Sequence, residues 1–230
     1  MLVMLIAWKG VGFGADLPEK IREELDRGKN RLESEFNAAE ETLLSSFDRK
    51  ISNARSAPKL TGEEKQQLIT SIEAEKSLFE TIGHLPFSSV MRTETIEYLN
   101  KVQKAEIALA KIYDRAVEYH TKQKNDEAAR ALVAEKNQSI EPKVAAKWTT
   151  TDPNLKNRTD TLTLLSNGSV KGWVGRTWTL DQRQLVTRWK KKDAPGGAWV
   201  DTCELSADGM HFDAKNQNGY KYSADRLTSE

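Results

Sequence analysis

The three histidines are the residues of this sequence best suited to acid-base catalysis or metal binding. His84, His120 and His211 stand far apart in the chain, in an expected turn, on a helical stripe and on an expected strand. A zinc site usually draws on closely spaced pairs of such ligands. We therefore expect each histidine to be structural or exposed, and we expect neither a metal site nor a cofactor.

Cys203 is the single cysteine, which excludes an internal disulfide framework and a multi-cysteine metal site. It shares the strand alternation of apolar neighbours and has no adjacent base that would lower the pKa of its thiol. We expect it to be a small buried hydrophobe. The sequence therefore predicts no catalytic residue.

A tryptophan and two basic residues form the best candidate for a binding surface. Trp173 shares its alternation with Lys171, and Arg188 and Lys190 occupy the polar alternation of an expected strand over 185–190. If the two faces adjoin, this surface would suit an anionic ligand, which the basic side chains attract, or a sugar, on which the tryptophan can stack. The alternative is a solvated face that carries one amphipathic tryptophan.

A hydrolase is the second class of function that the sequence leaves open. Paired carboxylates can act as a general acid and a general base. The acidic residues concerned are Asp201, Glu204 and Asp213. A pocket lined by two carboxylates would favour this function, whereas a barrel filled with aromatic side chains would argue against it.

Composition indicates that the chain has two small parts. It also argues against nucleic acid as a partner. The chain is 38% hydrophobic and 30% charged, which is too apolar for general disorder and too charged for a typical single-core enzyme. Residues 15–146 hold 21 Lys/Arg and 24 Asp/Glu, and residues 147–230 hold 13 and 10. Because this pattern contains no concentrated basic face, we expect no nucleic-acid binding.

Residues 1–15 are expected to be a signal peptide. A short apolar run, Met1 to Trp8, precedes small residues at Gly10, Gly12, Gly14 and Ala15, as in a hydrophobic region and its cleavage zone. No Lys or Arg precedes the run, and the alternative is an apolar N-terminal strand. We expect an exported protein, in the periplasm, on the cell surface or secreted, without an integral membrane span.

Residues 16–140 are expected to be a helical coiled-coil domain. Apolar residues recur at three- and four-residue spacing over 17–51, and Pro58 ends this helix. Thr61 and Glu64 predict a capping box for a second helix that ends near Gly83. Ser88 or Ser89 can cap a third helix, and Asn125 begins a short fourth one. We expect these helices to fold back as an antiparallel bundle.

Residues 141–230 are expected to be an all-β antiparallel meander, either a small barrel or a two-sheet sandwich. The hydrophobic period changes to two after Pro142, and turn signals such as Asn-Gly and Asp-Gly recur. The two parts are expected to fold independently. Eight strands are expected, near residues 146–150, 160–165, 170–174, 177–180, 185–190, 198–205, 210–214 and 220–225.

Strand alternation assigns the expected core of this module, which includes Trp189 and excludes Trp173. Five of the six tryptophans lie within residues 148–230. In so small a module large aromatic residues are usually the core itself. The expected core residues are Leu162, Leu164, Trp178, Leu180, Leu185, Trp189, Trp199, Cys203, Leu205, Phe212, Tyr220 and Tyr222.

Two stretches of the chain resemble segments of exported proteins from planctomycete-type bacteria. Glu73-Ala-Glu-Lys-Ser-Leu-Phe-Glu-Thr-Ile-Gly-His-Leu-Pro86, with Ala110-Lys-Ile-Tyr-Asp-Arg-Ala-Val-Glu-Tyr119, is similar to their helical segment. Gly197-Ala-Trp-Val-Asp-Thr-Cys-Glu-Leu-Ser-Ala-Asp-Gly209 is similar to their β module. The resemblance implies export and a two-part α+β architecture, and it transfers no functional residue.

These observations together favour a non-catalytic exported binding or scaffold protein. In this interpretation the coiled coil spaces or oligomerises the β module, which contacts another protein or a cell-envelope glycan. Self-association through the coiled coil is a further expectation.

Overall fold

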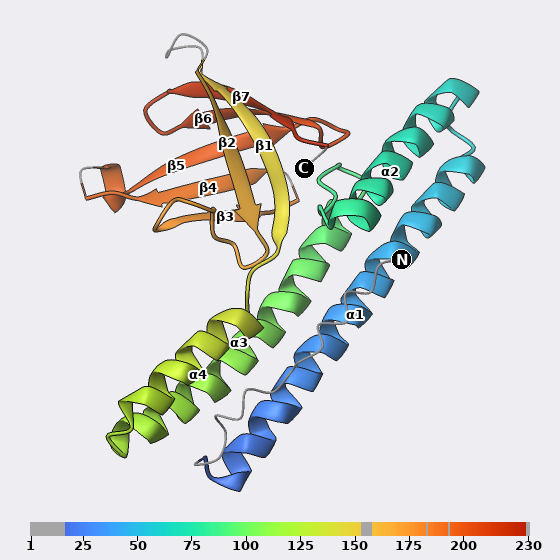
Figure 1. Ribbon diagram of the computed structural model, residues 1–230. Coiled ribbons are helices and arrows are strands. Elements are labelled where there is room, and N and C mark those ends of the chain that lie inside the picture. Colours follow the sequence, from blue (N-terminus) through green and yellow to red (C-terminus); the bar gives the residue numbers. More distant parts are fainter. Residues whose placement is uncertain (1–16, 153–157, 183, 193, 229–230) are drawn as a thin grey trace. The chain divides into compact units, whose positions relative to one another are not determined.

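The computed structural model describes residues 17–152, 158–182, 184–192 and 194–228, where four α-helices precede seven β-strands (Figure 1). This is the expected α+β layout in two parts. The expected signal peptide, residues 1–15, lies outside the described residues. Within the described ranges no helix combines the length and the apolar character needed to cross a membrane.

The second and fourth helices begin at their expected capping residues, whereas the third begins at Arg92, after a turn in which Met91 N donates to Ser88 Oγ. The capping box is confirmed, because Thr61 Oγ1 accepts from Glu64 N at 3.2 Å and Thr61 N donates to Glu64 Oε2 at 2.8 Å. Gly83, with φ of 71°, ends the second helix, and the Asn125 side chain accepts from Ala128 N at the start of the fourth. The bounds are α1 Glu19–Ser56, α2 Gly62–Ile82, α3 Arg92–Lys122 and α4 Asp126–Ser139.

Contacts within the chain divide it into two compact units. Of the described residues, the first unit combines those of 17–39 with 100–141, and the second combines 40–99 with those of 142–228. The chain therefore crosses between the two units at three points. One is near residue 141, where a boundary is expected, and the other two fall inside α1 and inside α3.

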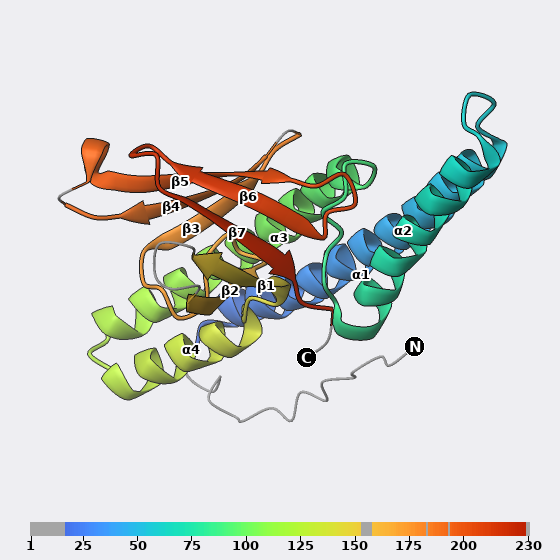
Figure 2. The same ribbon diagram turned by 90° about the horizontal axis from the view of Figure 1, so that it is seen from above.

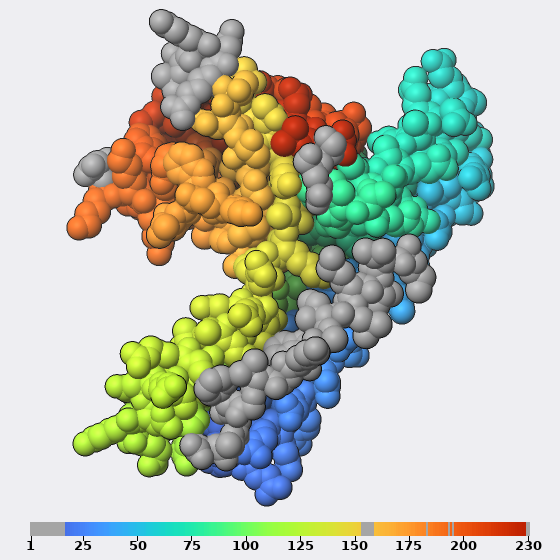
Figure 3. All heavy atoms as spheres, in the orientation of Figure 1, coloured from blue at the N-terminus to red at the C-terminus, as the bar shows by residue number. Residues whose placement is uncertain are grey.

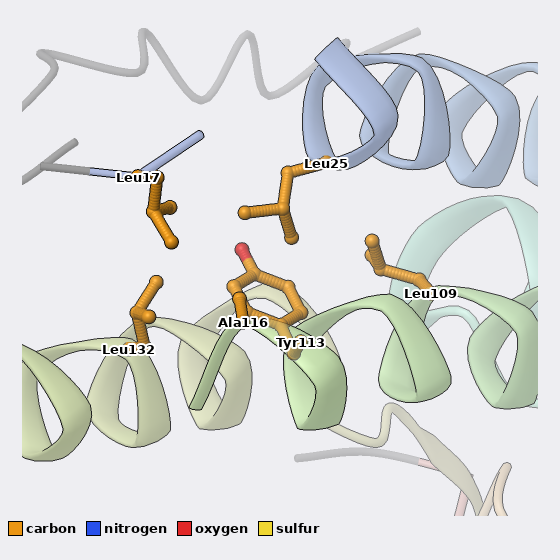
Figure 4. Packing of buried hydrophobic residues seen from close by; sticks show 6 residues of the cluster. All are labelled: Leu17, Leu25, Leu109, Tyr113, Ala116 and Leu132. Atoms are coloured by element: carbon orange, nitrogen blue, oxygen red, sulfur yellow. The ribbon is translucent and has the colours of Figure 1, made fainter. Parts of the chain in front are cut away.

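The first unit is organised around a small apolar cluster contributed by its three helices and by Leu17, which precedes α1 by two positions (Figure 4). Tyr113 is fully buried at its centre, and its hydroxyl donates to Glu135 Oε1 at 3.1 Å. Lys29 Nζ approaches the same carboxylate at 2.6 Å. The buried residues of the cluster are Leu17, Leu25, Leu109, Tyr113, Ala116 and Leu132.

The strands of the second unit form one antiparallel sheet that nearly closes into a barrel (Figure 2). Their order is β2-β1-β7-β6-β5-β4-β3. The two outer strands approach each other through residues 168–170, where Leu165 N donates to Ser169 O and Trp178 N donates to Gly168 O. The bounds are β1 Val144–Asp152, β2 Arg158–Leu165, β3 Arg176–Leu180, β4 Leu185–Lys190, β5 Ala198–Leu205, β6 His211–Asn216 and β7 Lys221–Arg226.

The expected strand over residues 170–174 is a turn, and this correction reduces the eight expected strands to seven in the described residues. Val170 forms only an isolated bridge, to Leu164. Gly172 and Gly175 have φ of 78°, a left-handed conformation that a strand does not contain. The backbone turns twice here, as Trp173 N donates to Val170 O and Arg176 N donates to Trp173 O.

The barrel core confirms most of the expected alternation, with two corrections. Tyr220 is 38% exposed rather than buried, because it lies in the hairpin before β7, beyond the end of the strand. Trp148, which the expected core omitted, is fully buried. Six expected residues are buried: Leu162, Leu164, Trp178, Leu185, Cys203 and Phe212. Leu180, Trp189, Trp199, Leu205 and Tyr222 are half-buried.

The connection between α2 and α3, residues 83–91, fills one part of the barrel. Phe87 is fully buried, and its ring meets the ring of Trp148 edge-on at 5.8 Å between centroids. Leu85 N donates to Ala145 O at 2.8 Å, and Ser89 N donates to Ala207 O at 2.9 Å. In Figure 3 green atoms, from the part of the chain that includes this connection, lie next to red atoms from the C-terminal part of the barrel. The connection therefore belongs to the core of the barrel.

Candidate ligand-binding site

The three expected binding residues lie on different sides of the β sheet. Trp173, which is 40% exposed, contacts Arg176 and Trp189, a pair of residues that face each other across β3 and β4. Arg188 and Lys190 are exposed on the opposite alternation of β4. The three residues therefore do not form the expected common surface. The prediction placed Trp173 in a strand over residues 170–174, and this segment is a turn.

The Arg176 side chain is stacked between two tryptophans. Its guanidinium carbon lies 5.4 Å from the ring centroid of Trp173 and 5.2 Å from that of Trp189. The two rings are edge-to-face, with centroids 4.8 Å apart. A cation against an aromatic face is attracted by the ring quadrupole, by about 2 kcal/mol when desolvated. These contacts fix the orientation of Trp173.

Below the tryptophans, Arg176 forms a buried ion pair with Asp201. Arg176 Nη2 donates to Asp201 Oδ2 at 3.0 Å and to Thr187 Oγ1 at 3.1 Å. The Thr187 hydroxyl donates to the same carboxylate oxygen at 2.9 Å, and the Tyr222 hydroxyl donates to it at 3.1 Å. We call Trp173, Arg176, Thr187, Trp189, Asp201 and Tyr222 the Arg176 cluster. Its one positive and one negative charge compensate each other.

Burial keeps the two weak acids beside this carboxylate protonated. It raises the pKa of the Cys203 thiol to about 12, with a further contribution from the Asp201 charge. Burial also raises the pKa of the Tyr222 phenol, and the charge of Asp201 raises this pKa further. Cys203 is fully buried, which confirms the expectation of a small hydrophobe, and its thiol is unsuited to act as a nucleophile.

The acidic residues considered for a hydrolase point to opposite faces of β5. Asp201 is inward and bonded to Arg176, whereas Glu204 is exposed and faces Asp213 across the outer surface. His211 joins that outer surface, with Nδ1 2.7 Å from Asp225 Oδ1, and this contact raises its pKa. Over the described parts of the chain, no group of three or more His, Cys, Asp or Glu side chains could hold a metal ion.

A second buried polar group, which the sequence analysis did not identify, joins α2 to β7. The side chains of Glu75 and Arg226 are at most 1% exposed, and Arg226 Nη1 lies 3.3 Å from Glu75 Oε1. That oxygen also accepts from Phe87 N at 2.6 Å and from Ser88 N at 2.9 Å. The only sequence signal for it is a glutamate on the apolar stripe of α2, near Ile72 and Leu78. Because both charges are enclosed, this pair is structural.

His84 lies in the same interior and carries no charge at neutral pH. It is 2% exposed, and burial together with the charges of Arg226 and Lys147 lowers its pKa to about 4. This outcome agrees with the expectation of a structural histidine. His120, on α3, is also buried, and its ring meets that of Tyr119 edge-on.

Comparison with known protein families, curated proteins and solved structures returns no match. The side chains themselves must therefore carry the functional argument, and of those described, the Arg176 cluster combines a charged pair with an exposed aromatic ring.

Proposed function

We propose that this protein is a non-catalytic exported binding or scaffold protein, in which a helical coiled coil presents the β barrel to a cell-envelope component, a glycan or another protein. The observation that carries this proposal is Trp173, which is 40% exposed although Arg176 and Trp189 hold it in place. An aromatic ring that is already ordered loses little conformational entropy when a ligand stacks on it. Ordered, exposed aromatic side chains are thus well suited to recognition.

The interior of the barrel favours binding over hydrolysis. Trp148, Trp178, Phe212 and the inserted Phe87 fill it with aromatic rings. The one inward carboxylate of the three considered, Asp201, accepts from three donors and faces a guanidinium. A hydrolase at this position would require a second free carboxylate beside it.

The helices supply the spacing part of the proposal. α1 has 38 residues, so it extends about 57 Å at 1.5 Å per residue. Ile107 on α3 and Val133 on α4 are 57% and 43% exposed, and apolar side chains in such positions support self-association. We therefore include pairing of helices from two copies in the proposed scaffold role.

A retention experiment on the full chain tests the binding role. The protein is incubated with insoluble cell-wall material, and the fractions bound by wild type, Trp173→Ala and Val174→Ala are compared. Val174 is the matched control, since it is the next residue of the same turn and is fully exposed. We expect Trp173→Ala to lose about tenfold in affinity and Val174→Ala to bind normally. Equal retention of all three proteins would contradict a binding role for Trp173.

A further inference from the structure

We propose that the Arg176 cluster binds the face of a neutral sugar ring, which stacks on the exposed side of Trp173. This inference rests on the proposed binding function and names the class of ligand. It draws on the charge, the size and the surroundings of the exposed ring.

The charge balance of the cluster disfavours ionic ligands. Arg176 donates to Asp201 and Thr187, so its positive charge is already compensated within the protein. An anion would compete with a buried carboxylate that three donors hold in place. A cation gains little, because a guanidinium already lies against the Trp173 ring. The remaining ligands are neutral ones that present C–H groups to an aromatic face.

The apolar surface that Trp173 itself exposes has the size of one ring. Among the described residues of the second unit, the exposed large hydrophobic side chains are Trp173, Val174 and Tyr220. A stable protein interface covers about 800 Å² on each partner, far more than a partly exposed tryptophan, which buries about 150–250 Å² in all. A sugar ring matches this area and carries its hydroxyl groups at the edge, toward water.

The surroundings of Trp173 leave room for a ligand that continues on either side. A Cβ placed on Gly172 or on Gly175 would meet no atom within 4 Å. A second aromatic side chain connects to the same cluster, since the Tyr222 hydroxyl donates to Asp201 and the Tyr220 ring lies 6.4 Å from that of Tyr222. Tyr220 is 38% exposed and offers a second platform. This arrangement suits an oligosaccharide.

Isothermal titration calorimetry of the full chain tests this inference with four soluble probes. The neutral probes are cellohexaose, chitohexaose and mannohexaose, and the anionic probe of matched length is hexagalacturonate. Each is titrated at low and at high salt into wild type, Trp173→Ala and Val174→Ala. Denaturant melts of the variants first establish that they fold. We expect at least one neutral probe to bind, with affinity insensitive to salt, reduced about tenfold or more by Trp173→Ala and unchanged by Val174→Ala.

Other outcomes overturn the inference in distinguishable ways. Salt-dependent binding of hexagalacturonate alone, lost in Trp173→Ala, would overturn the neutral class and leave the binding function standing. Failure of all four probes, together with Trp173-dependent retention on cell-wall material, would overturn the sugar and indicate a protein ligand. If neither retention nor titration changes in Trp173→Ala, the proposed function fails as well.

Discussion

At the scale of single residues, the Glu75–Arg226 pair makes the sharpest stability prediction. Removing one partner leaves the other charge in a closed apolar interior, which typically costs about 3–5 kcal/mol. Arg226→Met should therefore lower the free energy of unfolding by about that amount, as measured by urea melts. Arg55→Met is the matched control, because Arg55 pairs with Glu73 at the surface, and it should change stability by less than about 0.5 kcal/mol.

A double variant separates the charge from the shape of Arg226. If the cost comes from the unpaired carboxylate, adding Glu75→Gln to Arg226→Met should recover part of the loss. A purely additive second loss would show that Arg226 acts through its packing on Phe87 and Trp148.

His84 predicts how stability depends on pH. Its pKa is about 4 in the folded protein and about 6.5 in the unfolded chain, so the unfolded chain binds more protons between these values. Stability is therefore lost as pH falls from 6.5 toward 4, by about 2 kcal/mol at pH 5. Glu75 has a raised pKa and acts in the opposite direction, since its contribution is present at acid pH and lost as pH rises.

Urea midpoints at pH 7 and pH 5 test this prediction. The midpoint of wild type should fall more between these pH values than that of His84→Gln, whose side chain does not titrate. Parallel shifts in the two proteins would assign the acid sensitivity to other groups.

For three of the five tryptophans of the β module, the cost in stability of replacement by alanine should follow their burial. Trp148 is fully buried, so Trp148→Ala should cost about 3–5 kcal/mol. Trp189 is half-buried, so Trp189→Ala should cost less, and Trp173→Ala should cost about 1 kcal/mol or less because its ring is partly in water. Guanidinium melts give the order directly. A larger loss for Trp173 than for Trp148 would contradict the burial argument.

At the scale of elements, two glycines with the same backbone conformation separate strain from contact. Gly209 and Gly219 both end hairpins with positive φ, of 69° and 80°. A Cβ on Gly209 would lie 2.4 Å from the backbone of Phe87, whereas one on Gly219 would meet nothing within 4 Å. Gly219→Ala should cost about 1–2 kcal/mol from strain alone, and Gly209→Ala clearly more. Equal thermal midpoints of the two variants would show that the α2–α3 connection can move away from the added methyl group at little cost in free energy.

The elements also show what a sequence can and cannot predict. Caps such as Thr61 and Asn125 were predictable because their partners lie within three residues along the chain. The strands were predictable from their period, except at residues 170–174, where two glycines permit turns that alternation alone does not reveal. Phe87 reaches Trp148 from a distant part of the chain, and no local pattern indicates such a contact. For the same reason the sequence does not predict the stacking of Trp173 and Trp189 on Arg176, although it does predict that Trp173 is exposed.

At the scale of the whole molecule, the second unit predicts that residues 143–230 do not fold alone. That fragment lacks Phe87, which lies between Trp148 and Trp178, and it lacks the carboxylate that faces Arg226. Circular dichroism and tryptophan fluorescence should show an unfolded fragment, contrary to the independent folding expected from the sequence. A chain that joins residues 40–99 to 142–230 through a flexible linker should regain a cooperative melt. Cooperative melting of 143–230 alone would mean that residues 83–91 are dispensable.

The position of β7 has a consequence for the order in which this unit can form. It is the last of the seven strands in the chain, yet it lies inside the sheet, between β1 and β6, and it carries Arg226. The contact from Arg226 to Glu75 spans 151 positions of sequence. A contact of such long range forms only after a large loop has lost conformational entropy, and the stabilising interactions come after that loss. We therefore expect folding to be slow. As a ribosome releases the chain, Phe87 emerges before its aromatic neighbours Trp148 and Trp178. The guanidinium of Arg226, which covers the Phe87 ring, arrives only when β7 has been synthesised.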